Sequence, residues 1–401
     1  MNGAFYKHEF NIMLKSRKNL LFLLLLGIGL VIYCFMILPN YQSYNYYDRE
    51  RAELMVQEKE AMQEGRERRG ATGIILFTGM PVYAMDQYEI NINKAMMAAL
   101  DDENYYRFFH LHILNFGWNQ GSFLLDDPHF DDSPFPQKDR NHIYYKTMIK
   151  NESLISSDFK ITPALISEQT TVQALTNLFL GYLPFVLLFI VIFFSSDVVV
   201  RDRLNKTIIQ GIPLSWYRVI NIKSLVVFFY SLLIIVALAL LAVMFISIQF
   251  GFGYLSLQIG TMPLQQTFTL LDYETMSIGS YLLLTLSFLP ICAYLFIRLS
   301  VLFNLIFKNQ WVVLITSSLV LFLETFYFTR TTRELFGIDV SFFPQTYFDF
   351  GKVVTGEKNF LINVESITYT KGIVVLLISI LVVEVTLFIM AKWINKRRFY
   401  K

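Results

Sequence analysis

Residues 225–245 read LVVFFYSLLIIVALALLAVMF, an apolar run that no charged residue interrupts. A helix needs about 20 residues to cross the hydrocarbon core of a bilayer, because that core is about 30 Å thick and a helix rises about 1.5 Å per residue. Lipid offers no hydrogen-bond partners, so a crossing segment must satisfy its own backbone as a helix. This stretch therefore predicts a membrane-spanning helix.

Five further stretches have the same character, and with 225–245 they predict six spans. They cover residues 20–38, 174–194, 281–297 (with an extension to 307 as the alternative), 311–328 and 373–391. The expected fold class is an all-α polytopic membrane protein with six transmembrane helices. Only 16% of the 401 residues are charged, against about 25% in soluble domains, which fits several buried spans.

Charge and cysteine content narrow the class further. The net charge of +2 gives no reason to expect a nucleic-acid partner. Cys34 and Cys292 both fall inside apolar stretches, so a disulfide framework is not expected. The sequence has no phosphate-binding Gly-x-x-x-x-Gly-Lys-Ser/Thr motif and no His-Glu-x-x-His motif. His110, His112 and the acidic run 126–132 do not form a convincing metal-ligand pattern, so neither an enzyme nor a metal site is expected.

The distribution of Lys and Arg predicts the orientation, because basic residues in short loops mark the cytoplasmic side. They gather in residues 1–18, between the second and third spans, and in the C-terminal tail, whereas the loop 251–279 has none. The loop 329–372 has five, against the pattern. We expect a bacterial plasma membrane, both termini in the cytoplasm and a large loop outside.

The expected organisation has four parts. Residues 1–18 predict an interfacial amphipathic helix, with a simple basic flank of the first span as the alternative. Residues 19–39 are span one, 40–172 a mostly helical extracellular domain, and 173–401 a five-span membrane domain with a cytoplasmic loop at 197–223.

Within the extracellular domain the patterns predict individual elements. Helices are expected at 48–69 and 90–116, a short strand or turn at 74–77, and a loop at 117–136. Residues 141–167 are expected to return to the membrane as strand or helix.

Three ionisable residues fall within the predicted spans, where an unpaired charge costs several kcal/mol, about 3 for Arg or Asp. They are Arg298, Glu324 and Glu384. One interpretation is the polar lining of a substrate path, or a proton-coupled site at Glu384. The other is a structural contact between helices, with Arg298 paired to Glu384 because both lie in the inner half. The second interpretation is favoured.

The cytoplasmic loop is basic but too apolar for a simple linker. Its sequence predicts a short helix at 206–209, a break at 211–213, and a helix capped by Ser215 that leads into span three. Such a loop can dock a cytosolic partner or can merely fix the topology, and the residues alone leave both open.

The arrangement resembles the type 2 ATP-binding-cassette (ABC) exporter permeases. In that family the loop after span two carries a Thr, a Pro-x-Ser, a basic residue and a Lys, which Thr207, Pro213, Ser215, Arg218 and Lys223 match. The chain departs from the family at 202–206, where an acidic residue and a Gly are usual. Residues 343–348 resemble the family's re-entrant element, and the large outer loop resembles the subgroup of sodium, drug and peptide export permeases.

The resemblance implies a permease subunit that binds no cofactor itself. Its partners would be a second permease subunit, identical or different, membrane lipid, and cytosolic ABC ATPase subunits that bind ATP and Mg. The cargo would be amphipathic or hydrophobic. The ATPase-coupling residues that it implies are Arg201, Arg203, Lys206, Thr207, Pro213, Ser215, Arg218 and Lys223. The alternative function is a membrane sensor or assembly subunit that binds an external ligand without transport.

Overall fold

The computed structural model describes residues 2–44, 46–70, 72–75, 79–120, 132–157, 159–205, 213–262, 273–307, 309–362, 366–394 and 399. The chain divides into two compact units. The membrane unit contains residues 1–40, 171–256 and 260–401, and the inserted unit contains residues 41–170 with 257–259. The structure is 76% helical, which confirms the all-α class.

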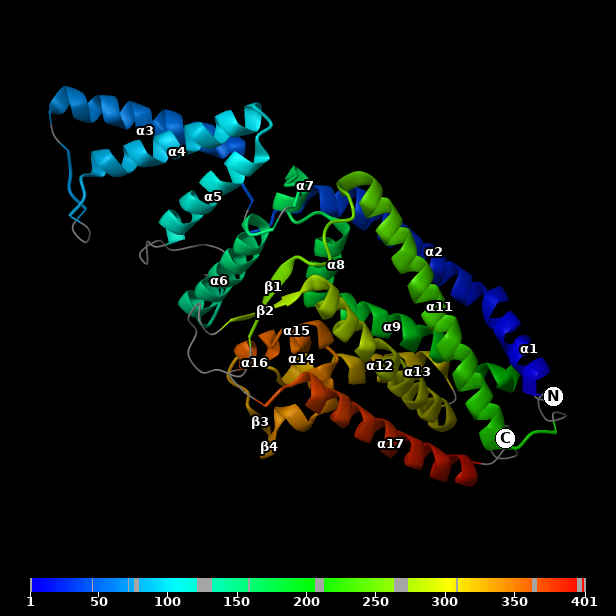
Figure 1. The fold of residues 1–401 in the computed structure, drawn as a ribbon. Helices are drawn as coiled ribbons and strands as arrows, with labels where there is room; N and C mark the ends of the chain where they lie inside the picture. The colour runs from blue at the N-terminus through cyan, green and yellow to red at the C-terminus, as the bar shows by residue number, and fades with distance from the viewer. Residues whose placement is uncertain are drawn as a thin grey trace. The chain divides into compact units, whose positions relative to one another are not determined.

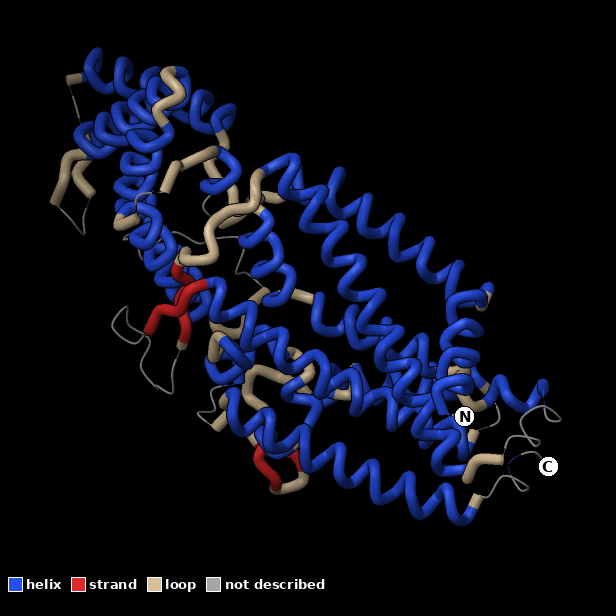
Figure 2. Tube along the Cα trace, turned by 45° about the vertical axis from the view of Figure 1, so that its right-hand side comes forward, coloured by secondary structure: helices blue, strands red, loops and turns tan. Residues whose placement is uncertain are grey.

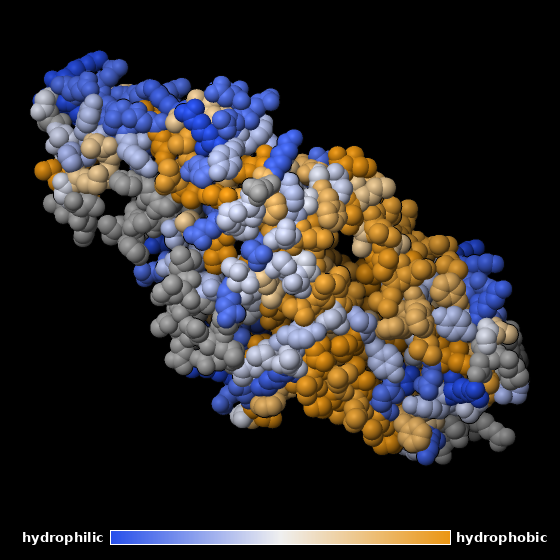
Figure 3. All heavy atoms as spheres, viewed as in Figure 1, coloured by the Kyte–Doolittle hydropathy of each residue, from blue (hydrophilic) through white to orange (hydrophobic). Residues whose placement is uncertain are grey.

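Among the described residues, five helical segments of the membrane unit are long and apolar enough to cross a bilayer. They are Arg17–Asn40 (α2, Arg17–Ile32, with the short turns after it), Leu183–Arg203 (beginning with α9, Leu183–Ser195), Trp216–Phe250 (α11), Ile278–Ile306 (α12) and Tyr369–Trp393 (α17). Hydrophobic side chains cover these helices, and hydrophilic ones gather around α1 (Asn2–Lys15) (Figure 3). The chain is therefore a membrane protein, as the sequence predicts.

The span expected at 311–328 is not one continuous helix. Helix α13 (Gln310–Leu321) has 12 residues, too few to cross a bilayer alone. The chain turns at Phe322 and resumes as the four-residue helix α14 (Glu324–Tyr327). The turn places the Glu324 carboxylate against the ammonium group of Lys358. This ion pair gives a physical reason for the early end of α13.

The span expected at 174–194 is also divided. Helix α8 (Thr171–Leu180) and helix α9 are separated at Gly181 and Tyr182. Pro184 lies in the first turn of α9, where its missing N–H costs nothing because that group has no partner within a helix.

Contacts between side chains show the direction of each long helix. Tyr369, at the start of α17, donates or accepts a hydrogen bond at 2.8 Å with Ser287 of α12. Further along, Glu384 of α17 contacts Arg298 of α12, so these two helices run in parallel. The end of α9 also meets the end of α12, since Asn304 donates to the Ser195 carbonyl.

Helices α2 and α11 run the opposite way. Phe22, near the start of α2, stacks on Phe193 at the end of α9, with ring centroids 3.8 Å apart. Ser224, near the start of α11, accepts from Arg298 in the second half of α12. Both termini therefore lie at one end of the membrane unit, where α9, α12 and α17 finish; we call this the terminal end (Figure 1).

The opposite end of the membrane unit is built from short elements. Strands β3 (Glu334–Leu335) and β4 (Ile338–Asp339) pair there (Figure 2). Strand β1 (Gln258–Thr261), whose first two residues belong to the inserted unit, pairs with β2 (Glu274–Ser277). Two 3₁₀ turns, η6 (Val340–Phe342) and η7 (Pro344–Tyr347), precede helices α15 (Phe350–Val354) and α16 (Glu357–Ile362). The segment 343–348 is thus a tight turn.

Helix α15 packs closely on the membrane helices. Phe350 stacks on Phe288 of α12, with ring centroids 5.9 Å apart. At Gly351 a Cβ atom would lie 1.9 Å from the Phe179 carbonyl oxygen, so no larger residue fits there. This contact fixes α15 against the end of α8.

The inserted unit contains helices α3 (Arg49–Arg69), α4 (Val82–Asp101), α5 (Tyr105–Gln120), α6 (Pro136–Ile155) and α7 (Pro163–Ile166). The helix expected at 48–69 is confirmed. Asp48 caps its start by accepting from the Arg51 N–H, and Gly70 ends it in the left-handed conformation, with φ 61°.

Other expectations for the inserted unit need correction. The helix expected at 90–116 is two helices, because the chain turns at 102–104, where Glu103 has φ 53°. Residues 141–167 take the helical alternative, as α6 and α7. Ile74 forms an isolated bridge with Pro81. Residues 76–78 and 121–131 lie outside the described residues, but the expected loop at 117–136 begins in α5, which extends to Gln120.

Helices α3 and α4 are joined by partly buried ion pairs. Lys59 of α3 lies 2.9 Å from Asp86 of α4 and also contacts Glu89. Arg66 of α3 contacts the second oxygen of Asp86. Burial alone would raise the pKa of Asp86, but the hydrogen bonds from Arg66 and Lys59 outweigh it and lower that pKa.

We expect Asp86→Asn to destabilise the pairing of α3 with α4 by about 1.5–3 kcal/mol at pH 7, the usual contribution of hydrogen bonds to a charged group. The folded pKa lies below the unfolded value, so the stabilisation is present above about pH 4 and lost as the pH falls below it. Hydrogen exchange of α3 and α4 in the full chain should therefore differ between variant and parent at pH 7, and differ less at pH 3.

Glu60→Gln is the matched control, because the Glu60–Lys94 pair joins the same helices but is 44% and 53% exposed. Exposed pairs contribute about 0–1 kcal/mol. Equal effects of Glu60→Gln and Asp86→Asn would contradict the assignment of the buried pair.

Candidate functional site

A buried ion network joins the amino-terminal helix to two other segments at the terminal end. Glu9 of α1 lies 3.0 Å from Arg201 and 2.8 Å from Lys223. Lys223 of α11 also pairs with Asp202 at 2.9 Å. Arg201 and Asp202 belong to the 3₁₀ segment η4 (Val200–Asn205). Two acids and two bases thus bind α1, η4 and α11 into one charge-balanced junction.

The junction is sealed from solvent at its centre. The side chain of Lys223 is 1% exposed and that of Glu9 is 5% exposed. Breaking a buried ion pair by removing one partner leaves an uncompensated charge, which costs about 3–5 kcal/mol. The three segments are therefore expected to move together.

A second ion pair at the terminal end joins α2 to α9. Lys18 lies 3.3 Å from Asp197, and its ammonium group donates to the Phe193 carbonyl and to the Ser196 hydroxyl at 3.0 and 2.8 Å. These acceptors lie at the end of α9. The start of the first span is thereby fixed to the segment that leads into η4.

The C-terminal tail also reaches this junction. Phe399 is 1% exposed. Its ring lies 5.2 Å from that of Trp216 and 4.3 Å from the Arg203 guanidinium. Phe399 therefore covers Trp216 at the start of α11 and Arg203 of η4.

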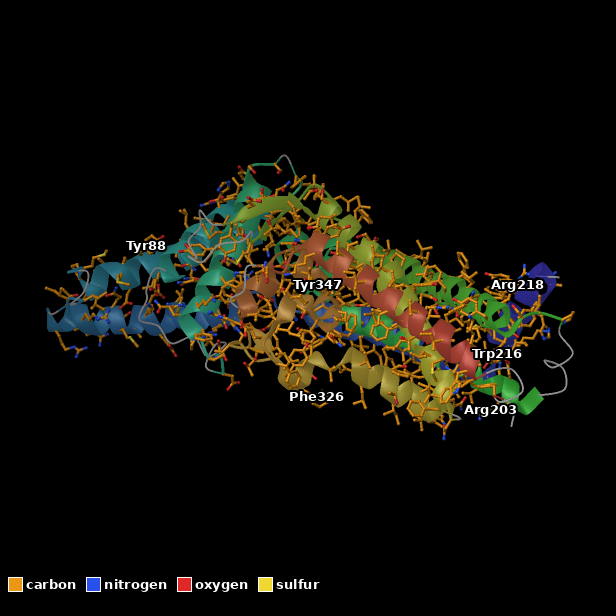
Figure 4. The ribbon with its side chains drawn as sticks, turned by 90° about the horizontal axis from the view of Figure 1, so that it is seen from below. Tyr88, Arg203, Trp216, Arg218, Phe326 and Tyr347 are labelled. Carbon is orange, nitrogen blue, oxygen red and sulfur yellow. The ribbon has the colours of Figure 1, made fainter. Side chains whose placement is uncertain are left out.

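The predicted coupling residues fall into three groups. Arg201, Arg203 and Lys223 are engaged in the contacts described above. Pro213, Ser215 and Arg218 are exposed at the start of α11, and Ser215 precedes that helix without a side-chain capping bond. Arg203, Trp216 and Arg218 lie at the same end of the unit (Figure 4). Lys206 and Thr207, with the short helix expected at 206–209, lie outside the described residues.

Sequence reasoning missed the acidic half of the junction. Glu9 and Asp202 pair with the basic residues that the sequence singled out. One signal was present: Glu9 is the single acidic residue in the basic segment 1–18. A lone acid among bases on an otherwise apolar helix is a candidate for a buried pair.

A second network lies where α11, α12 and α17 meet. The Arg298 Nε and Nη2 atoms lie 2.5 and 2.6 Å from the two carboxylate oxygens of Glu384. Arg298 Nη1 donates to Asn221 and Ser224 of α11, at 3.0 and 2.9 Å. The structure thus contains the pair that the structural interpretation expects.

Two tyrosines complete the partners of Glu384. Tyr294 of α12 donates at 2.7 Å and Tyr217 of α11 donates at 3.4 Å. The Arg298 side chain is 2% exposed, whereas that of Glu384 is 25% exposed. The Glu384 carboxylate is thus the solvent-accessible member of the network, and both of its oxygens already have partners.

Glu324 belongs to a third network, at the end opposite the termini. It pairs at 2.9 Å with Lys358 of α16, and both side chains are buried. Asp349 pairs with Lys352 at 3.0 Å and lies 3.8 Å from Lys358. Burial, partly offset by Lys358 and Lys352, raises the pKa of Asp349. Glu324 is therefore placed in a structural contact between α14 and α16.

The described residues contain no group of three His, Cys, Asp or Glu side chains that could hold a metal ion. His110 lies 4.5 Å from the Tyr106 ring, and His112 stacks on Phe108 at 5.7 Å. The acidic run is outside the described residues except for Asp132.

Comparisons of the chain with protein-family models, curated proteins and solved structures find no match. The resemblance to type 2 ABC permeases therefore stays a prediction from the sequence.

Glu384→Gln should lower the unfolding temperature of the detergent-purified chain, because it leaves the buried Arg298 cation without a counter-charge. The expected cost is about 3–5 kcal/mol, and the apolar double variant Arg298→Met with Glu384→Leu should recover most of it. Thermal unfolding of the single variants Arg298→Met and Glu384→Leu and of their double variant measures the coupling. Additive effects of the two single changes would show that the pair contributes nothing of its own.

Proposed function

We propose that the chain is the membrane-spanning permease subunit of an ABC exporter, driven by ATP that a separate cytosolic subunit hydrolyses. The observation that carries this proposal is the junction of Glu9, Arg201, Asp202 and Lys223, which lies beside the exposed segment of Pro213, Ser215 and Arg218. A motor that contacts that segment needs a rigid connection to the spans. The buried junction offers one to α11 and α1 at once.

The arrangement of the helices supports six crossings. Helices α12 and α17 run in parallel, so the chain between them has to return across the membrane. Helix α13 runs back along α12, with the Ser300 and Ser317 hydroxyls 3.1 Å apart. Phe322 then stacks near Phe185 at the start of α9, with ring centroids 5.9 Å apart. Residues 310–328 thus supply one crossing more than the five long helices, which brings the total to six. This crossing is the fifth along the chain and is broken at Phe322.

The orientation follows from the same arrangement. An even number of crossings leaves both termini on one side, and the basic residues gathered at the terminal end favour the cytoplasm. A bacterial plasma membrane is the proposed location. The inserted unit then lies outside.

The proposed mechanism is a switch between two arrangements of the spans. Closure of two ATPase subunits would push on the exposed residues around Arg218, and the junction would pass that push to α1 and α11. A second permease subunit, identical or different, would complete a closed dimer with a central path. The proposed cargo is amphipathic or hydrophobic, as a peptide, an antibiotic or a lipid-like molecule is.

The alternative is a membrane sensor or assembly subunit that binds an external ligand and transports nothing. The inserted unit, a compact helical body of its own, is the observation that favours it. In that case the exposed residues near the start of α11 have no motor to contact.

We expect the full chain to co-purify with a stoichiometric ATPase subunit from its native membrane, and the variants Pro213→Asp and Arg218→Glu to lose it. Both residues are exposed and outside the buried junction, so the variants should fold normally. The readout is the ratio of the two subunits after affinity purification.

The matched control is the charge reversal Arg68→Glu on α3, where the side chain of Arg68 is 80% exposed. This variant should leave the ratio of the two subunits unchanged. Purification of the parent chain alone, with an unaltered response to external ligands in both loop variants, would favour the sensor instead.

A further inference from the structure

The hairpin of β3 and β4 carries an unusual residue at its tip. Phe336 and Gly337 connect the two strands, with φ 55° and 76°. A two-residue turn with both φ values positive favours Asn, Asp or Gly at its first position. A bulky residue in the left-handed region is an outlier that needs a reason.

The tip is apolar as well as strained. Phe336 is 92% exposed, the largest value among the large hydrophobic residues that the structure describes, and Ile338 and Phe342 are 50% and 61% exposed. Water would penalise this exposure by about 25 cal/mol per Å² of apolar surface. Covering these residues with an apolar surface would therefore be favourable.

The patch of Phe336, Ile338 and Phe342 is continuous with the lipid-facing side of α17. The Lys371 ammonium, in the first turns of α17, lies 4.2 Å from the Phe342 ring centroid. Val374 and Ile378 follow Lys371 on one helical face, at i+3 and i+7, and are 54% and 58% exposed. Figures 1 and 2 show the hairpin beside the start of this helix.

Basic side chains border the patch, as they do where proteins meet lipid headgroups. Arg333 is exposed just before β3. Lys371 donates to the Ser341 hydroxyl at 2.5 Å, which leaves further ammonium protons for another acceptor. Two cations beside an apolar tip fit headgroup phosphates above acyl chains.

We propose that the β3–β4 hairpin inserts Phe336 into the membrane leaflet opposite the terminal end, with Arg333 and Lys371 binding the phosphates of anionic phospholipid. The hairpin is an interfacial anchor for the start of α17. It also accounts for Arg333 and Lys371 in the loop 329–372, whereas Lys352 and Lys358 pair with buried acids and Arg330 donates to the Leu361 carbonyl. The proposal depends on membrane insertion and not on the exporter function.

The test is a spin label at Phe336→Cys in the full chain, reconstituted into phosphatidylcholine vesicles. Cys34 and Cys292 are fully buried, so the label attaches at the new position. Oxygen, which concentrates in the acyl region, should relax this label several-fold more strongly than a water-soluble nickel chelate. A label at Thr331→Cys, an exposed polar position five residues earlier, is the matched control and should show the reverse.

Three outcomes overturn the proposal or part of it. Equal nickel access at 336 and 331 would place the tip in water. Protection of 336 from both reagents would indicate that a protein surface covers it. Adding phosphatidylglycerol should raise the oxygen preference at 336, and Arg333→Glu should abolish that increase; an unchanged increase would refute the phosphate contact alone.

Discussion

The hydrocarbon core of a bilayer provides no partner for a charge, and the architecture of the membrane unit depends on this constraint. Three ion networks give buried charges the partners that lipid lacks: Glu9 with Lys223, Arg298 with Glu384, and Glu324 with Lys358. Each network joins segments that are distant in sequence. Because an unpaired member costs several kcal/mol, about 3–5, each network also fixes which helices are neighbours.

The networks group the segments of the membrane unit into connected bodies. At the terminal end α1, η4 and α11 form one body, and Lys18 adds the start of α2 through Asp197. Around Arg298 the three helices α11, α12 and α17 share one set of hydrogen bonds. At the opposite end the Glu324–Lys358 pair holds the short elements on the spans. In the proposed mechanism, force on the exposed start of α11 reaches the spans through the first two networks.

The sequence predicts the class well, because apolar runs and span lengths are local properties of the chain. It also predicts Arg298 and Glu384 as partners, since both are charges at similar depth. It does not reveal Glu9, Asp202 or Lys358 as partners, because each lies outside the predicted spans, where a charge does not require a buried partner. The sequence also does not predict the breaks at Gly181 and Phe322: the first lies just before Pro184, and the second accompanies the Glu324–Lys358 pair.

The central claim is that residues 310–328 return the chain across the membrane, so that six crossings leave both termini in the cytoplasm. Single cysteines at Asn309 and Thr331, which flank this segment and are both exposed, test it with a membrane-impermeant maleimide on intact cells. The account predicts that Thr331→Cys reacts in intact cells, whereas Asn309→Cys reacts only after the cells are permeabilised. Labelling of both positions under the same condition would place them on one side and contradict this crossing.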